Sequence, residues 1–386
     1  MIVVEDNPEK RMGADVLLVG GGHAHVAVLA DWARRGLPRG TSGSVRAVLL
    51  SPEPVLRYSG MVPGWLAGQH AGDDGLVDLA ALAKRAGAVW IADRCAAFDP
   101  DSRTVTTADG RVIAFGIASF DTGGVGRGEA LLGADPRLVD VRPIAAFVER
   151  LAAMRAAACA PARAVIVGGG AGGVELAFGF RNLAGADPRP KVTLVTGAGG
   201  LLPGFAVGVR QRAARALARQ GIAVVAEDAQ VSGGALMAGG QSLEPADLVI
   251  AATGSAAPGW VRASGIATDA GGFLSVDAHH RSVSHPHIYA AGDVAARSDR
   301  PLAHAGVHAV FAGPVIAANL RKALAGESPR AAYRPRRHNL YLMNTGDGSA
   351  ILSYGPFSAE GRWVLALKHR IDKAWIAKYA AIAGGA

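Results

Sequence analysis

Two clusters of glycine follow short apolar runs, and each has a spacing that suits phosphate binding. Gly20 and Gly22 take the first two positions of a G-x-G-x-x-G turn after the apolar run 15–19, and an apolar helical stretch, 26–32, follows. Glycine at the first position permits a tight turn, and glycine at the second lets the backbone approach a phosphate at the N-terminus of the next helix. This arrangement predicts dinucleotide binding.

The second cluster is a complete copy of the same pattern. Gly168, Gly170 and Gly173 follow the apolar run 164–167, and 174–177 continues as a helix. It begins about 148 residues after the first copy. One such turn is a weak signal because glycine is common in loops, but two copies, each between a strand and a helix, are much stronger. We therefore expect two dinucleotide-binding units.

Both copies lack the acidic residue that usually ends the second strand of such a unit and binds the ribose hydroxyls. The strand expected at 45–50 ends at Ser51, which can still make one hydrogen bond, and Glu53 lies nearby. The strand expected at 192–195 ends at Thr196, and no arginine follows closely to bind an NADPH phosphate. The pattern leaves the choice between NADH and NADPH open.

Two histidines lie beside the first glycine turn. His23 and His25 are candidates to donate hydrogen bonds or charge to a diphosphate. The alternative is a packed histidine bonded to the backbone, and His25 stands where a small third residue usually allows close helix–strand packing. No third ligand lies at a useful spacing for a metal ion, so no metal site is expected.

Composition narrows the remaining classes. The chain has 386 residues, 50% hydrophobic and 19% charged, which suits two or three globular domains. Its net charge of +8 comes without a nucleic-acid-binding motif, so no nucleic-acid partner is expected. Cys95 and Cys159 form neither a disulfide framework nor a metal-binding spacing, which favours a reducing cytoplasm. Segment 1–13 has no apolar signal region, and no run is long enough to span a membrane.

Three further motifs stand in a fixed order along the rest of the chain. They are Thr122-Gly123 within 121–124, Thr253-Gly254 after the apolar run 248–251, and Gly292-Asp293 about 40 residues later. This order resembles that of the pyridine nucleotide–disulfide oxidoreductase superfamily, whose members have two dinucleotide-binding domains. The resemblance implies that Gly292 and Asp293 contact FAD, with the carboxylate on the ribityl chain. It also implies that 121–124 and 252–254 are the two crossings between the domains.

A narrower likeness is to type II NADH dehydrogenases and sulfide:quinone reductases. The segments 20–26, 58–64, 305–310 and 313–320 resemble a flavoprotein subgroup that is often fused ahead of a selenide, water dikinase module. An association with that kinase, and with selenium metabolism, is suggested only by this fusion. The resemblance extends from about residue 14 to residue 379.

The resemblance also implies how electrons would pass. Disulfide reductases carry a close cysteine pair near the start of the first domain, whereas that region here is the cysteine-free loop 58–64. Ser59 and Gly60 of this loop are expected against the flavin ring, and the alternative is an ordinary surface turn. FAD would then accept a hydride directly and pass electrons onward without a protein disulfide.

Two residues are candidates for catalysis by the same resemblance. Glu175, just after the second glycine turn, is expected to reach the nicotinamide carboxamide, and the alternative is a carboxylate favoured by the helix N-terminus. His304 opens the helix expected to face the flavin pyrimidine, where the subgroup usually carries lysine. Histidine there would make the charge at this helix end depend on pH.

The sequence thus predicts an α/β protein with two Rossmann-like domains and a small C-terminal α+β region. The expected bounds are 14–125 and 250–325 for the FAD domain, 126–249 for the NAD(P) domain, and 326–386 for the C-terminal region. In the last, strands are expected at 340–342, 349–353 and 363–367, and a basic amphipathic helix at 368–381. That helix could bind a membrane surface, but docking on the protein's own core or on a second subunit, as in a homodimer, is favoured.

We expect a FAD-dependent NAD(P)H dehydrogenase that reduces a quinone or another small acceptor. It would be cytoplasmic, either free or peripheral on the cytoplasmic membrane face. One alternative is a selenium- or sulfur-linked flavin reductase. The other is a flavin-binding partner protein without turnover, an interpretation kept open by Ser51 and Thr196.

Overall fold

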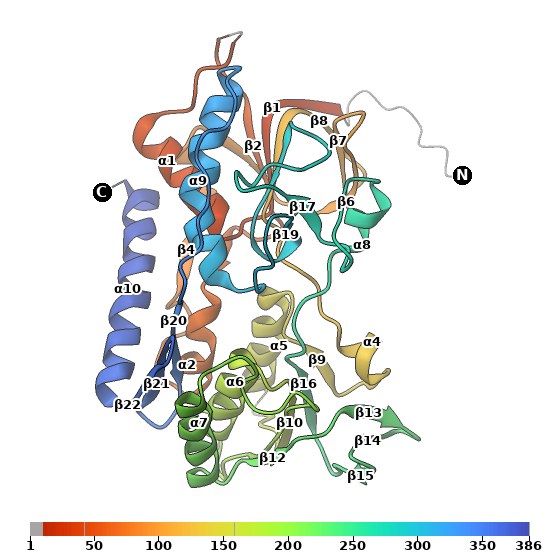
Figure 1. Ribbon diagram of the computed structural model, residues 1–386, viewed down its shortest axis with the longest axis vertical. Coiled ribbons are helices and arrows are strands. Elements are labelled where there is room, and N and C mark those ends of the chain that lie inside the picture. Colours follow the sequence, from red (N-terminus) through yellow and green to blue (C-terminus); the bar gives the residue numbers. More distant parts are fainter. Residues whose placement is uncertain (1–10, 42, 158, 386) are drawn as a thin grey trace.

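The computed structural model describes residues 11–41, 43–157 and 159–385 (Figure 1). Segment 1–10, which holds most of the stretch expected to lack a secretory signal, lies outside these residues. Two sheets, one mainly and one entirely parallel, form separate halves of the molecule, one above the other in Figure 1. A third, small sheet and a long helix lie along one side.

The upper sheet has the strand order β5-β2-β1-β8, all parallel, and β8 also pairs with β18 and with the hairpin β7-β6. The strands are β1 (Arg11–Val19), β2 (Ala47–Leu50), β5 (Ala88–Ile91), β6 (Cys95–Asp99), β7 (Thr104–Thr107), β8 (Val112–Phe120) and β18 (Ile288–Ala290). Side chains alternate along β1: Val16 and Leu18 face α1 (His23–Arg35) and α9 (Gly306–Leu324), whereas Leu17 and Val19 face the opposite layer. A parallel sheet covered on both faces is what a nucleotide-binding α/β domain requires.

Smaller elements complete this half of the molecule. They are β3 (Val55–Arg57), β4 (Leu76–Asp78), β17 (Leu274–Val276), β19 (Ala295–Arg297), the 3-10 turns η2 (Ser59–Met61) and η3 (Gly292–Val294), and the helices α2 (Val62–Leu66), α3 (Leu79–Arg85) and α8 (Gly259–Ala263). Of these, α2 packs against the other half of the molecule through α6. The loop that precedes α2 therefore lies where the two halves meet.

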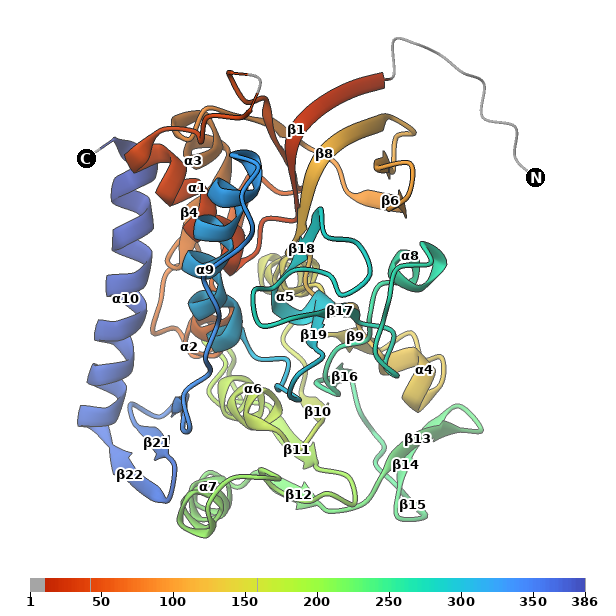
Figure 2. The same ribbon diagram turned by 45° about the horizontal axis from the view of Figure 1, so that its top comes forward.

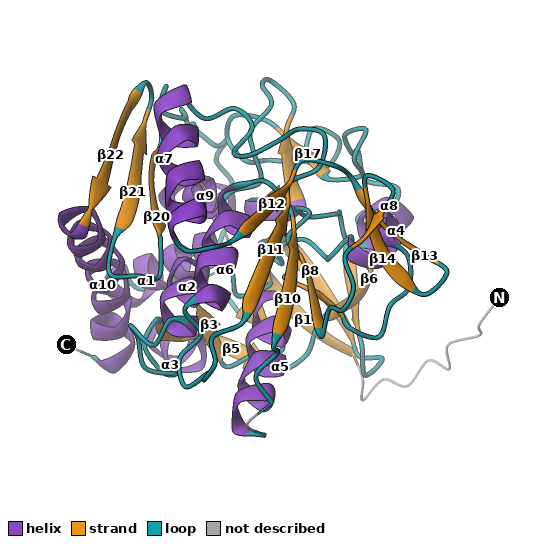
Figure 3. Ribbon diagram, turned by 90° about the horizontal axis from the view of Figure 1, so that it is seen from below, coloured by secondary structure: helices purple, strands orange, loops and turns teal. Residues whose placement is uncertain are grey.

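The lower sheet has five parallel strands in the order β12-β11-β10-β16-β9. They are β9 (Leu138–Asp140), β10 (Arg163–Val167), β11 (Lys191–Val195), β12 (Ala223–Val225) and β16 (Leu248–Ala251), and the helices are α4 (Gly128–Leu132), α5 (Ile144–Ala156), α6 (Ala171–Arg181) and α7 (Val207–Arg219). A small antiparallel sheet follows β12 in the chain, with the strands β13 (Ala229–Ser232), β14 (Ala235–Ala238) and β15 (Gln241–Ser242). Figure 3 shows α6 and α7 beside β11 and β12.

The two crossings between the halves lie side by side. Val125 and Ala256 exchange both backbone hydrogen bonds, each at 2.9 Å. Since β16 pairs with β10 up to Ala251, the domain boundary that we expected between residues 249 and 250 falls inside this strand. The return to the upper half therefore begins after Ala251.

The C-terminal region departs from the expectation at its last strand. The strands β20 (Leu340–Asn344), β21 (Ala350–Tyr354) and β22 (Phe357–Gly361) form an antiparallel sheet, and α10 runs from Arg362 to Gly384. The strand expected at 363–367 is the first turn of this helix. The apolar run is too short to distinguish a strand from a helix by its pattern alone. The segment is helical because one face at helical spacing is buried, the face that carries Val364, Leu365, Lys368 and Asp372.

Helix α10 docks on the rest of its own chain. It contacts α1, α3, β4 and β21, and Figures 1 and 2 both show it along one side of the molecule. Tyr379, Ile382 and Ala383 belong to the same buried cluster as α1 and α9. No helix in the described part of the chain is long and apolar enough to cross a membrane.

Candidate functional site

The first glycine turn lies at the carboxyl end of β1, tight against the next strand. Gly20 has φ +93°, and a Cβ built there would lie 2.5 Å from the carbonyl oxygen of Asp121. The amide of Gly22 donates to the same oxygen at 3.2 Å. The turn therefore brings the N-terminus of α1 to the carboxyl ends of β1 and β8, where dinucleotides bind in such sheets.

The carboxylate of Asp121 fills the N-terminus of α1. Its Oδ2 accepts hydrogen bonds from the backbone amides of Ala24, at 2.7 Å, and His25, at 3.1 Å. Asp121 is 3% exposed. Burial raises the pKa of Asp121 to about 7, and the nearby Asp293 acts in the same direction, although the two amide hydrogen bonds oppose the rise.

The two histidines of the turn have different surroundings. His25 is fully buried: Nδ1 donates to the Gly20 carbonyl at 2.6 Å, and Nε2 lies 2.8 Å from Ser119 Oγ. Each ring nitrogen thus has a protein partner, which matches the packed histidine rather than a cofactor ligand. The ring of His23 instead lies 5.2 Å from that of Trp375 on α10. Burial lowers the pKa of both histidines to about 4, so both are neutral at pH 7.

Asp293 lies within reach of both halves of the molecule. Nη2 of Arg142, from the loop between β9 and α5, is 2.6 Å from Asp293 Oδ2. Ser255, on the returning crossing, donates to the same oxygen at 3.1 Å. A Cβ on Gly292 would lie 2.4 Å from Oδ1 of Asp121, so this turn also closes on the first glycine motif. Gly20, Gly22, Gly292 and Asp293 are thus brought together as the sequence predicts.

The second glycine turn has the same backbone but an open N-terminus. Helix α6 begins after Gly170 with no side-chain cap, and a Cβ on Gly170 would meet no atom within 4 Å. Gly168 and Gly173 are instead closely packed, since a Cβ on Gly173 would lie 2.0 Å from the Gly168 carbonyl oxygen. The Oγ1 of Thr253 is buried and has no hydrogen-bond partner in the structure. Free amides at a helix N-terminus suit an anionic phosphate.

We expect Gly170→Ala to impair nicotinamide binding without harming the fold. The added methyl group meets no protein atom, but it occupies the space that the turn leaves for a phosphate. The KM for the nicotinamide donor should rise about tenfold or more, the equivalent of about 1.4 kcal/mol, while the melting temperature and flavin content stay near wild type. Gly259→Ala is the matched control, because its Cβ is also unobstructed at a helix start. An unchanged KM in Gly170→Ala would contradict the phosphate role.

The loop 58–64 is covered by α10. The rings of Tyr58 and Trp375 are stacked with centroids 5.0 Å apart, and His23 meets Tyr58 edge-on at 5.5 Å. Ser59 and Gly60 form the 3-10 turn that follows Tyr58, next to the buried Met61. The loop is therefore part of an aromatic contact between the glycine turn and α10 rather than a free surface turn.

Glu175 lies in a buried cluster of charges between α6 and α10. Its Oε1 accepts the backbone amide of Asn344 at 2.9 Å. Burial raises the pKa of Glu175, although the Lys368 ammonium opposes this. Burial acts to lower the pKa of Lys368, but Glu175 and Asp372 outweigh it and the pKa is raised. Lys368 Nζ lies 3.1 Å from Asp372 Oδ2. The ammonium group thus pairs directly with Asp372 and acts on Glu175 through its charge.

The other predicted residues have less decisive positions. Ser51 is buried beneath the first turn, where its hydroxyl donates weakly to the Glu53 carbonyl at 3.3 Å. Thr122 and Gly123 follow Asp121 at the first crossing, and Gly254 turns the second one with φ +86°. The ribose contact of Ser51 and the flavin contacts of these crossings stay predictions.

His304 does not open the helix as expected. Helix α9 begins at Gly306, and His304 lies in the loop before it with its ring 4.0 Å from that of Phe273. Ala305 is the N-cap of α9, so His304 precedes the helix by two residues and packs on Phe273 instead. Its role toward a flavin stays a prediction.

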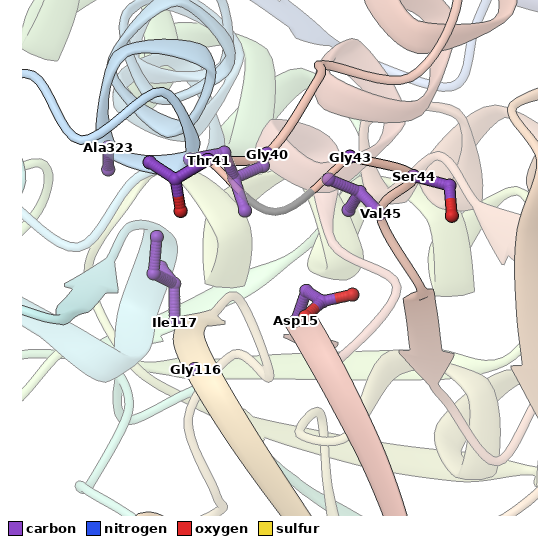
Figure 4. Close-up of a pocket in the computed structure, with 10 residues that line it drawn as sticks. Asp15, Gly40, Thr41, Gly43, Ser44, Val45, Gly116, Ile117 and Ala323 are labelled. Carbon is purple, nitrogen blue, oxygen red and sulfur yellow. The ribbon is translucent and has the colours of Figure 1, made fainter.

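A cavity elsewhere in the upper half is separate from these residues. It has a volume of about 190 Å³ and is lined by Thr41, Val45, Asp15, Ile117 and Ala323, among others (Figure 4). These residues lie before β2, partway along β1 and β8, and at the end of α9, away from the carboxyl ends of the strands. Ligands in open α/β sheets bind at the carboxyl ends, so we do not assign this cavity to a dinucleotide. No cluster of three metal-ligating side chains occurs among residues 11–41, 43–157 and 159–385.

Four residues of the site were missed at the sequence level: Asp121, Arg142, Lys368 and Asp372. The segment 121–124 was recognised as a crossing, but nothing in it indicates that its first side chain reaches α1. Arg142 acts on Asp293, and Lys368 acts on Glu175, both far away in the chain. The pair of Lys368 with Asp372 is local, but a pair four residues apart on a helix does not by itself indicate a site.

The molecule has two dinucleotide-binding folds and a polar cluster where they meet, and one of the two folds offers an open helix N-terminus. These features are those of an oxidoreductase with two nucleotide-binding domains. Residues 14–310 match the pyridine nucleotide-disulphide oxidoreductase family, and the chain belongs to this family. This membership supports FAD as the cofactor and NAD(P)H as its electron donor. No curated protein matches the sequence significantly.

Solved structures share the fold over most of the chain. The sulfide:quinone oxidoreductase of Aquifex aeolicus is 17% identical with a TM-score of 0.70, covering 95% of this chain and 91% of its own. The ferredoxin reductase of Rhodopseudomonas palustris is 20% identical with a TM-score of 0.69, covering 87% and 81%. The water-forming NADH oxidase of Lactobacillus brevis is 20% identical with a TM-score of 0.69, covering 89% and 75%. At these identities the likeness speaks for the fold alone.

Proposed function

We propose that the protein is a FAD-dependent NAD(P)H dehydrogenase that reduces a quinone or another small acceptor without a protein disulfide. One observation carries the proposal: α6 links the two sites. Its N-terminus is open for a dinucleotide phosphate, and Glu175 in its first turns reaches the buried cluster beside loop 58–64. A single rigid helix therefore positions a donor near the residues that adjoin the flavin site.

The cysteines support transfer without a disulfide. Cys95 is buried in β6, Cys159 is exposed after α5, and both are free thiols. Burial raises the pKa of Cys95 to about 12, which makes its thiol unreactive at neutral pH. The place of a redox cysteine pair is taken by loop 58–64, which packs against α10 instead.

The residues around that loop are suited to proton transfer and to a planar acceptor. Bound FAD supplies the hydride chemistry. The cluster of Glu175, Lys368 and Asp372 can hold a proton at the Glu175 carboxyl group, since burial favours its neutral form. Tyr58 and Trp375 offer stacked aromatic surface and exclude water.

Unmet hydrogen-bonding groups near the same contact favour a polar ligand there. Both ring nitrogens of His70 and Nε2 of His369 are buried without a partner in the described structure. The two rings are 4.8 Å apart, one beside loop 58–64 and one on α10. Buried donors or acceptors without partners are costly, and an oxygen atom of a quinone could accept a hydrogen bond from the N–H group of either ring.

Peripheral contact with the cytoplasmic membrane face, where a quinone would be met, is part of this proposal. Phe357 and Trp363 are 71% and 57% exposed at the end of the C-terminal sheet and the start of α10. Exposed large aromatic side chains of this kind suit a membrane interface.

Anaerobic mixing with a nicotinamide donor tests the proposed function. The purified protein should be yellow, and NADH or NADPH should bleach the flavin absorbance within the mixing experiment. Reoxidation by a quinone, compared with selenium and sulfur species, then identifies the acceptor. A flavin that neither donor bleaches would refute the dehydrogenase and favour a flavin-binding partner protein or another donor.

A further inference from the structure

The two helix N-termini that face the nucleotide sites are unequally occupied. Among the described residues, no side chain accepts a hydrogen bond from the first amides of α6, and a Cβ on Gly170 would meet no atom within 4 Å. The amides of Ala24 and His25 in α1 are already bonded to the carboxylate of Asp121. Anions compete for such amides because the partial positive charge at a helix N-terminus attracts any of them. The N-terminus of α1, where the FAD diphosphate is expected, is thus already occupied by an anion of the protein itself, the Asp121 carboxylate.

The position of Asp121 is central to the flavin site rather than beside it. Cβ atoms built on Gly22 and Gly292 would lie 2.3 and 2.4 Å from atoms of the Asp121 carboxyl group. The carboxyl group therefore lies between the first glycine turn and the turn that carries Asp293. These are the two motifs to which the resemblance assigns FAD binding, and both lie within the residues 14–310 that match the family.

We propose that Asp121 is an internal competitor of the FAD diphosphate: FAD binds with full affinity only when the Asp121 carboxyl group is neutral. The proposal rests on FAD as the cofactor but not on the electron donor or acceptor. A charged carboxylate at the α1 amides would both retain their hydrogen bonds and repel a diphosphate. A neutral carboxyl group gives up the charge attraction and removes the repulsion.

Four other titratable or charged groups face Asp121 or its neighbour Asp293, from α1, η3 and the loop before α5. From α1, His23 and His25 are neutral, because burial lowers the pKa of each to about 4. From η3, Asp293 is paired with Arg142, which comes from the loop before α5. Burial raises the pKa of Asp121 to about 7, so its carboxyl group changes charge between pH 6 and pH 8. Affinity should therefore be highest below pH 7 and fall as the pH rises through 7.

Titration of flavin-free protein with FAD at several pH values tests the proposal. Binding is followed by the quenching of flavin fluorescence from pH 5.5 to 8.5. For full competition at a pKa of about 7, the Kd should rise about tenfold from pH 6 to pH 8. Asp121→Asn keeps an acceptor for the α1 amides without the charge. It should bind FAD about as tightly as wild type at pH 6, and about tenfold more tightly at pH 8.

Two further variants make the test specific. Asp293→Asn removes a charge from the same site. Its affinity for FAD should still fall as the pH rises, with the midpoint displaced to lower pH because the Asp293 charge helps to raise the pKa of Asp121. Asp121→Ser is a second neutral variant in case Asp121→Asn does not fold, and the wild-type profile decides if neither folds. A Kd independent of pH in the wild type overturns the proposal, as does a pH dependence that survives in Asp121→Asn. Weaker FAD binding by Asp121→Asn at every pH would make Asp121 a ligand instead. If the wild type binds no FAD at any pH, FAD as the cofactor is refuted as well. Failure of the Asp121 proposal alone is therefore distinguishable from failure of the proposed cofactor.

Discussion

Replacing Lys368 with methionine is expected to destabilise the protein by about 3–5 kcal/mol at neutral pH, the usual loss when one partner of a buried ion pair is removed. Lys368 and Asp372 have side chains only 8% and 5% exposed, with Nζ and Oδ2 3.1 Å apart. Glu175 depends on the same ammonium group. Without it, two buried carboxyl groups have no cation to offset their desolvation, and methionine fills the space without replacing the charge.

The loss in Lys368→Met should depend on pH. Without the ammonium group the pKa of Glu175, already raised by burial, rises further. A carboxyl group whose pKa is raised in the folded state is favoured in its neutral form. The variant is therefore least destabilised at a pH below the pKa that Glu175 has in the unfolded chain, and it loses stability as the pH rises above that value. The gap between variant and wild type should therefore narrow as the pH falls from 7 to 5.

Urea unfolding at several pH values measures this effect. Lys373→Met is the matched control: it removes the same charge from an exposed position on α10 and should change stability by less than about 0.5 kcal/mol. Adding Asp372→Asn to Lys368→Met should recover part of the loss, because one unpaired carboxylate is then gone. Equal losses in Lys368→Met and Lys373→Met would show that the buried cluster does not depend on its cation.

The features that could be predicted from the sequence are those with local causes. The strand at 248–251 has the bounds that its apolar run indicates, and the glycine turns at Gly20 and Gly168 stand between a strand and a helix as expected. An apolar run and a glycine turn each act within a few residues, so no distant contact is needed to recognise them. Even here β1 begins at Arg11, four residues before its apolar run, because β8 pairs with it over that stretch.

The features that were missed depend on long-range contacts. Asp121 reaches α1 from 97 residues away. The charge of Lys368 acts on Glu175 only because β20 packs against both α6 and α10. The apolar run at 363–367 is helical because it is buried against β21. That contact is a tertiary one, so the local sequence does not reveal it and predicts a strand instead. His25 shows the same limit within the glycine motif itself. It stands where the third glycine is usual, and its hydrogen bond to Ser119 on β8, which helps to explain a histidine there, is a long-range contact.

Replacing Gly20 with alanine is expected to abolish flavin retention and to destabilise the protein. Two causes add. The backbone has φ +93°, a strain of about 1–3 kcal/mol for a non-glycine residue. The new Cβ would also lie 2.5 Å from the Asp121 carbonyl oxygen and 2.6 Å from Thr122 Cα, and overpacking of this kind costs about 1–3 kcal/mol. Neither neighbour is a side chain that can turn away, so β1 and β8 must separate where the first turn meets the crossing.

Gly36→Ala separates the two causes at the other end of the same helix. Gly36 follows α1 with φ +75°, but a Cβ there would meet no atom within 4 Å. It should therefore show the backbone strain alone, of about 1–3 kcal/mol, and keep its flavin. The measurements are the FAD-to-protein ratio after purification and the free energy of unfolding of the flavin-free proteins. If Gly20→Ala retains FAD and loses no more stability than Gly36→Ala, then the close approach of β1 to β8 at the first turn is not what the flavin site requires.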